Sequence, residues 1–121
     1  MEWIFTDDRP IWQQIVEQLT LRILRGEYPP GERLPGVREL AAQAGVNPNT
    51  MQRAMAQLEA DGLAVGSRTA GRTVTRDAAV IEAAARARAR AAVIECLKTL
   101  GELGYSAEDA LKFVKEELQH E

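Results

Sequence analysis

Two short helical patterns follow each other in "VRELAAQAGVNPNTMQRAMAQLEADG", residues 37–62. The first is expected to end at Gly45, because glycine readily adopts the left-handed conformation that closes many helices. The second is predicted over residues 48–61, since Asn47 is a good N-cap and Pro48 a good first helical residue. Its apolar stripe consists of Met51, Ala54, Met55 and Leu58. Two helices joined by so tight a turn predict a helix-turn-helix.

The start of the second helix carries polar side chains on the face opposite its apolar stripe. Four residues are left pointing outward when the stripe faces the core. They are Pro48, Asn49, Gln52 and Arg53. Asn and Gln side chains bind adenine through two hydrogen bonds, while Arg suits guanine or a phosphate. The pattern therefore predicts a recognition helix that reads bases in the DNA major groove.

A longer helix is predicted before this pair, over about residues 9–25, where apolar residues recur at helical spacing. Asp8 or Arg9 is its candidate N-cap. The segment "GEYPPGERLPG", residues 26–36, then turns the chain and extends it. Within that segment, Pro30–Gly31 suits the central pair of a type II turn.

A two-stranded hairpin is predicted after the pair, in "LAVGSRTAGRTVT", residues 63–75. Apolar and polar residues alternate on both sides of a glycine-containing loop, which favours strands near 63–67 and 72–76. Arg68 and Arg72 lie near the tip, where they suit phosphates or the minor groove. A helix-turn-helix followed by such a hairpin is a winged helix.

Charge and composition limit the possible functions. The 121 residues have a net charge of −3, but residues 9–76 hold nine Arg and six acidic residues and are net basic. One cysteine, Cys96, and one histidine, His120, supply neither a disulfide framework, a zinc site nor a catalytic set. We expect no enzyme and no cofactor. Because the chain has neither a leader nor an apolar span, we expect no membrane contact and a cytoplasmic location.

Residues 10–74 resemble the DNA-binding part of GntR-type bacterial transcription regulators. The resemblance rests on "PIWQQIVEQLTLRILRGEYPPGERLPGVRELAAQAGVNPNTMQRAMAQLEADGLAV" and the later "GRTV", whose motifs occur together and in order. It implies a winged-helix regulator that binds a palindromic operator in double-stranded DNA as a homodimer. It also implies DNA contacts at positions that match the family's motifs. These are Arg38, Asn49, Thr50, Gln52 and Gly71.

The sequence departs from the commonest family pattern at two of the base-reading positions. Many members have Arg where Pro48 and Gln52 stand here. The resemblance therefore implies a different base code. "NPNT" and the short C-terminal part are similar to the YtrA-type branch, in which only a pair of helices follows the winged helix.

Residues 77–121 are too short for the effector-binding domain found in the larger branches. They predict a long Ala-rich helix and a second helix capped by Ser106 in a box with Asp109. Such a pair buries too little apolar surface to be stable alone, so we expect it to pack against a second copy. A small-molecule effector is possible, but the sequence contains no evident pocket for one.

Three residues that could contact ligands are expected to have structural roles. Trp12 and Tyr28 are predicted to close the core of the winged helix. Cys96 lies within the apolar run 93–97 and is expected to be buried rather than redox-active.

The sequence thus predicts a mostly α protein with a small β-hairpin. A winged helix-turn-helix (residues 1–76) is followed by a two-helix dimerisation hairpin (residues 77–121). The expected function is a homodimeric DNA-binding transcription regulator, most simply a repressor. The alternative is a winged-helix module that binds protein and assembles a complex. Basic groups on both the recognition helix and the wing favour DNA.

Overall fold

The computed structural model describes residues 2–69 and 71–120. Contacts divide the chain into an N-terminal unit that ends at Ala84 and a C-terminal unit that begins at Ala85. The elements are α1 (Ile11–Leu24), α2 (Val37–Ala44), α3 (Pro48–Ala60), β1 (Ala64–Ser67), β2 (Gly71–Val74), α4 (Ala78–Glu102) and α5 (Ala107–Gln119). The expected mostly α fold with a small hairpin is confirmed.

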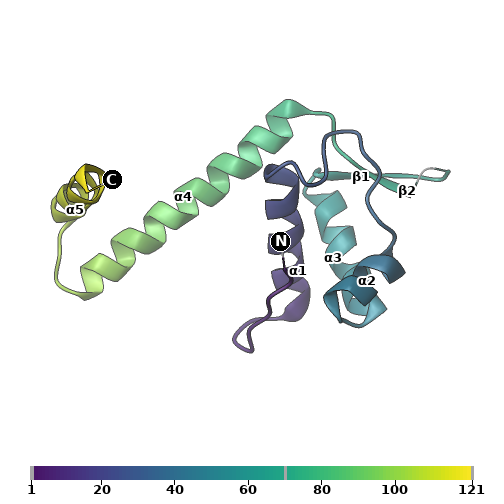
Figure 1. The fold of residues 1–121 in the computed structure, drawn as a ribbon, viewed down its shortest axis with the longest axis horizontal. Coiled ribbons are helices and arrows are strands. Elements are labelled where there is room, and N and C mark those ends of the chain that lie inside the picture. Colours follow the sequence, from purple (N-terminus) through teal and green to yellow (C-terminus); the bar gives the residue numbers. More distant parts are fainter. Residues whose placement is uncertain (1, 70, 121) are drawn as a thin grey trace. The chain divides into compact units, whose positions relative to one another are not determined.

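The core of the N-terminal unit is built around α3, which contacts α1, α2 and β1 (Figure 1). The predicted stripe of α3 is buried, and each of its four side chains is at most 1 % exposed. Around it lie apolar residues from α1, from α2 and the segment before it, and from the hairpin. They include Ile15, Leu19, Leu34, Leu40, Leu63 and Val74. This packing leaves the opposite face of α3 in solvent.

The ends of α2 and α3 follow the sequence prediction closely. Gly45 closes α2 in the left-handed conformation, with φ of 71°. The Asn47 side chain then caps α3, because its Oδ1 accepts a hydrogen bond of 2.8 Å from the Asn49 amide. The prediction for the start of α1 was wrong, since Pro10 is the N-cap and makes no side-chain hydrogen bond.

The hairpin is antiparallel, with Ala64 opposite Val74 and Ser67 opposite Gly71. Its strands are shorter than the predicted 63–67 and 72–76. A third segment joins β2, because Leu34 donates a 2.9 Å hydrogen bond to the Arg72 carbonyl. A matching isolated bridge joins Arg33 to Thr73. These backbone contacts attach the segment before α2 to the two-stranded wing.

The turn at residues 29–32, just before the segment that pairs with β2, has type II character, as predicted. The Glu32 amide donates a 3.0 Å hydrogen bond to the Pro29 carbonyl. Gly31 at the third position has φ of 80°, which a side chain would disfavour. Tyr28, just before the turn, packs against the core as expected. Burial raises the pKa of its phenol.

The first turns of α4 belong to the N-terminal unit. Val80, Ile81 and Ala84 pack against its core. The compact unit thus ends inside α4 rather than before it. Within the described residues, no helix has both the length and the apolarity needed to cross a membrane.

The C-terminal unit consists of the rest of α4 and α5. The predicted capping box is present: Asp109 donates its amide to Ser106 Oγ at 3.1 Å, and Ser106 donates its own to Asp109 Oδ2 at 3.0 Å. Tyr105 and Phe113 meet edge to face, with ring centroids 4.9 Å apart. Of the residues described in this unit, only Ala110 is a buried apolar residue.

Cys96 corrects one sequence prediction, because it is exposed rather than buried. The apolar run around it lies on an open face of the C-terminal unit. Two adjoining grooves of about 350 Å³ each follow that face. The first groove is lined by Ala92, Val93, Cys96, Leu97, Ala107, Ala110, Leu111 and Val114. The single chain contains no element that covers Cys96 among the residues described.

Candidate nucleic-acid interface

The N-terminal end of α3 presents polar side chains to solvent, as the apolar stripe predicts. Pro48, Asn49, Gln52 and Arg53 are all exposed, and Thr50 is half-buried. The first turn contains no acidic residue. The amides at a helix N-terminus carry partial positive charge, so this end of α3 favours a negatively charged partner.

Arg53 is held in place by α1. Its guanidinium carbon lies 4.2 Å from the centroid of the Trp12 ring. This cation–π contact restrains the guanidinium, whose N–H groups can still donate to an acceptor. Trp12 therefore supports a side chain of the exposed surface, whereas the sequence predicted that it closes the core.

Arg38 lies in the first turn of α2 and is exposed. On the opposite side of this short helix, Leu40 and Ala41 are buried in the core. The α2 N-cap is Gly36, which supplies no side-chain hydrogen bond. The start of α2 is thus a second helix end with an exposed arginine.

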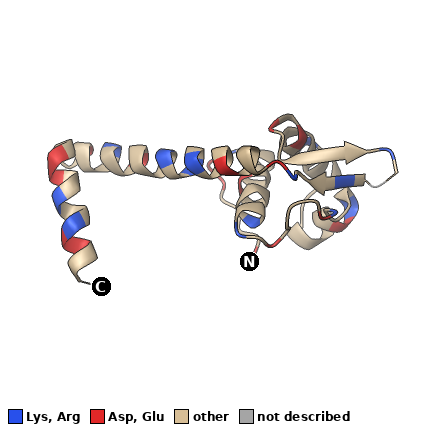
Figure 2. Ribbon diagram, turned by 90° about the horizontal axis from the view of Figure 1, so that it is seen from above, with Lys and Arg blue, Asp and Glu red and all other residues tan. Residues whose placement is uncertain are grey.

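The wing carries the remaining predicted residues, and its two arginines differ. Arg68 follows β1 and is exposed. Arg72 lies in β2 and forms an ion pair with Glu59 of α3, with side chains 21 % and 38 % exposed respectively. Figure 2 shows basic residues on the hairpin and near its tip. Arg72 is therefore turned toward α3, whereas the sequence suggested a position at the tip.

Gly71 begins β2 with φ of 68°, a conformation that favours glycine. A Cβ at this position would come within 3.4 Å of the Arg33 Nε. Gly66, on the opposite strand, has a similar relation to Glu59, since a Cβ there would lie 3.1 Å from its Oε1. Gly66 thus makes room for the Glu59 carboxylate, whereas Gly71 is favoured by its backbone conformation.

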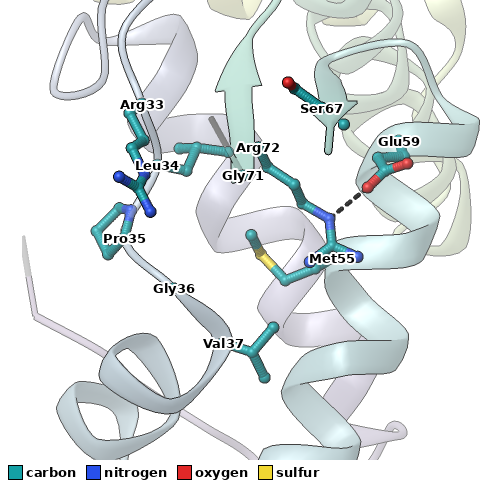
Figure 3. A pocket seen from close by; sticks show the side chains of 11 residues that line it. Arg33, Leu34, Pro35, Gly36, Val37, Met55, Glu59, Ser67, Gly71 and Arg72 are labelled. Atoms are coloured by element: carbon teal, nitrogen blue, oxygen red, sulfur yellow. Dashed lines mark hydrogen bonds and ion pairs between the residues drawn. The ribbon is translucent and has the colours of Figure 1, made fainter. Parts of the chain in front are cut away.

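Sequence reasoning missed Arg33 and Glu59. Both line a pocket of about 280 Å³ between the wing, the start of α2 and α3 (Figure 3). Arg33 reaches it because residues 31–34 pair with β2, which local sequence patterns do not reveal. Glu59 could have been suspected from its position, since it follows Gln52 by two helical turns and shares its face.

The arrangement suits binding rather than chemistry. In residues 2–69 and 71–120, no group of three or more His, Cys, Asp or Glu side chains could hold a metal ion. The exposed groups are amides, a hydroxyl and arginines on two helix ends and a hairpin. Such groups donate hydrogen bonds to phosphates and to base edges.

Comparisons with known proteins agree with this arrangement. Residues 11–74 match the model of the family described as bacterial regulatory proteins, gntR family. The chain is 34 % identical over 111 residues to the uncharacterized HTH-type transcriptional regulator YhcF of Bacillus subtilis, covering 92 % of each protein. It is 39 % identical over 69 residues to the HTH-type transcriptional repressor YtrA of the same organism, covering 57 % of this chain and 53 % of that one.

Solved structures show the same relationship. A GntR family transcriptional regulator from Listeria monocytogenes superposes with a TM-score of 0.84 at 35 % identity, covering 93 % of this chain and 98 % of that one. The DNA-binding domain of AraR, solved in complex with an operator, has a TM-score of 0.57 at 26 % identity and covers 62 % of this chain and 96 % of that one. These relatives are named as regulators and not as enzymes. The chain belongs to the gntR family of bacterial regulatory proteins.

Proposed function

We propose that this protein is a transcriptional repressor that binds a palindromic operator as a homodimer. The observation that carries the proposal is the N-terminal end of α3, where Asn49, Gln52 and Arg53 project from a helix whose other face is locked in the core. A side chain reads a base well only when its helix is held rigidly.

Base reading is assigned to Asn49 and Gln52, and backbone contacts to the arginines. An amide side chain can bind adenine through two hydrogen bonds. Arg38, Arg53 and Arg68 are exposed around this helix end and suit phosphates. The AraR domain, of similar fold, is solved on its operator, which supports DNA as the partner of this chain too.

Dimerisation is assigned to residues 77–121. The support is the open apolar face of the C-terminal unit, where Val93 is 59 %, Leu111 58 % and Leu118 66 % exposed. Apolar surface of this kind is stabilised when a second copy covers it, at roughly 25 cal/mol per Å² buried. A two-fold dimer then presents two α3 helices to a DNA site with matching symmetry.

The repressor assignment is supported by the similarity to YtrA of Bacillus subtilis, which is named as a repressor. A protein that occupies an operator overlapping a promoter blocks transcription without needing a further domain. A reporter gene behind a site bound by this chain tests the assignment. Expression should fall when the chain is produced, and a rise would make the protein an activator.

Selection from a library of random duplexes tests DNA recognition and symmetry together. The full chain should enrich an inverted repeat whose half-sites lie about one helical turn, roughly 34 Å, apart. An enriched single half-site would contradict the dimer. Failure to enrich any sequence, with no binding to duplex DNA, would favour the alternative of a protein-binding module.

A further inference from the structure

The pocket between the wing and the start of α2 contains a cationic pair that the base-reading surface does not use. Its charged lining consists of Arg33, Arg72 and Glu59, which together carry one net positive charge. Ser67 and the backbone at Gly36 complete the polar side of the pocket. One phosphodiester carries one negative charge, so a single DNA phosphate would neutralise this lining.

The two arginines approach the pocket from different elements. Arg33 comes from the segment before α2 and Arg72 from β2, and Figure 3 shows them on either side of the pocket, with Met55 between them. Arg33 is exposed. Among the residues that the structure describes, no ion pair or side-chain hydrogen bond involves its guanidinium. It can therefore turn toward an incoming acceptor.

Arg72 is oriented by Glu59. The carboxylate oxygen Oε1 accepts from Arg72 Nε, so the two terminal nitrogens of Arg72 stay available as donors. The pair is only partly exposed, which restricts how far the arginine can move. Gly66 leaves space for this carboxylate, because a Cβ there would lie 3.1 Å from Glu59 Oε1. The wing backbone thus approaches the Glu59 carboxylate closely.

We propose that this pocket holds one phosphate of the DNA backbone between Arg33 and Arg72, and that Glu59 is the positioning residue that aims Arg72 at it. The inference rests on the proposed DNA binding and names a contact within it. It assigns a favourable role to an acidic side chain on a DNA-facing helix, where charge alone would make it unfavourable. That reversal makes the inference testable.

The test measures binding of the full chain to a random-sequence duplex at several salt concentrations. Each phosphate neutralised contributes about 0.9 to the slope of log affinity against log salt. Arg33→Gln and Arg72→Gln should each weaken binding. Because both arginines hold the same phosphate, the double variant should lower the slope by about 0.9 for each bound N-terminal unit. A decrease of about 1.8 would mean two separate phosphates and would overturn the shared site.

Arg25→Gln is the matched control, since Arg25 is an exposed arginine of the same unit that does not line the pocket. It removes the same charge and should leave the slope unchanged. An Arg33→Gln variant that binds duplex as tightly as wild type at every salt concentration would overturn the inference. If the wild-type chain does not bind duplex at all, the proposed function fails instead, so the two failures are distinguishable.

Glu59→Gln tests the positioning role. Simple electrostatics predicts tighter binding to DNA when this negative charge is removed. The inference predicts weaker binding, with a slope that falls toward that of Arg72→Gln. Tighter binding with an unchanged slope would show that Glu59 competes with DNA for Arg72, and would overturn the positioning role.

A last arm distinguishes DNA phosphate from a free anion. Inorganic phosphate is titrated into wild type and the double variant at constant ionic strength, and amide shifts around Gly36 and Gly71 are followed by NMR. The inference predicts no saturable shift at millimolar phosphate. Saturation in wild type that is lost in the double variant would assign the pocket to a free oxyanion and overturn the assignment to DNA.

Discussion

Substitutions of Asn47, at the start of the proposed DNA-binding helix, should change the stability of α3 and the affinity for DNA in different directions. Its side chain is used as a cap, since Oδ1 accepts from the Asn49 amide at 2.8 Å. Alanine removes the cap, aspartate keeps it and adds a negative charge, and serine keeps it without charge. All three are small changes at an exposed position.

The expected magnitudes follow from the local geometry. Asn47→Ala should lower the free energy of unfolding by about 1 kcal/mol, the usual cost of a lost N-cap. For a unit the size of residues 1–84, this lowers the melting temperature by about 4–8 °C. Asn47→Asp should match wild type or gain about 0.3–1 kcal/mol, because a carboxylate favours the positive end of the helix. Asn47→Ser should stay close to wild type.

DNA binding should rank the variants differently. If the N-terminal end of α3 faces DNA as proposed, a carboxylate there should weaken binding to duplex DNA by about tenfold or more, through like-charge repulsion. Asn47→Ser, the matched control, should bind as wild type does. Urea unfolding at fixed protein concentration and fluorescence anisotropy with labelled duplex measure the two properties. If Asn47→Asp binds DNA as tightly as Asn47→Ser, this end of α3 does not face DNA.

Three further predictions concern the interface and the dimer. Gln52→Ala should cost about 1–3 kcal/mol on a selected operator but little on random duplex, as measured by anisotropy; equal losses on both would make Gln52 a backbone contact. Val114→Asp should give monomers in sedimentation, whereas Gln119→Asp, which adds the same charge outside the grooves, should stay dimeric; a dimeric Val114→Asp protein would move the interface elsewhere. Cys96, the single thiol, should react with maleimide more slowly as protein concentration rises, and a rate independent of concentration would leave it outside the dimer contact.

Much of the N-terminal unit could be predicted because its signals are local. The Gly45 turn and the Asn47–Pro48 helix start each need only neighbouring residues, and both are present as predicted. Burial of the α3 stripe follows from its spacing. The helices of the C-terminal unit were also predictable, because the Ser106–Asp109 box is a short-range motif.

The features that escaped prediction depend on partners distant in sequence. The bridge between Arg33 and Thr73 joins residues whose own neighbourhoods contain no signal for each other. The same holds for Arg72 and Glu59, which meet only when the wing packs beside α3. Cys96 was expected to be buried because it lies in an apolar run, but it is exposed. An apolar run alone does not show whether the surface that covers it belongs to the same chain or to a second molecule.

The N-terminal segment is another long-range feature. The Gln14 side chain accepts from the Thr6 amide at 2.9 Å and donates to the Thr6 carbonyl at 2.8 Å. Gln18, one turn later, makes the same pair of bonds with Ile4. The side chains of these two glutamines thus hold residues 4–6 against α1. Helical periodicity marks both glutamines only as polar positions.

We propose that α3 and the wing form the DNA-binding surface of this protein. The most direct measurement is an NMR titration of the isotopically labelled full chain with a short duplex selected from a random library. Amide shifts should concentrate at residues 47–53 and 66–73 and at the start of α2, with little change in residues 105–120. Shifts confined to the C-terminal unit, with residues 47–53 unaffected, would contradict this proposal.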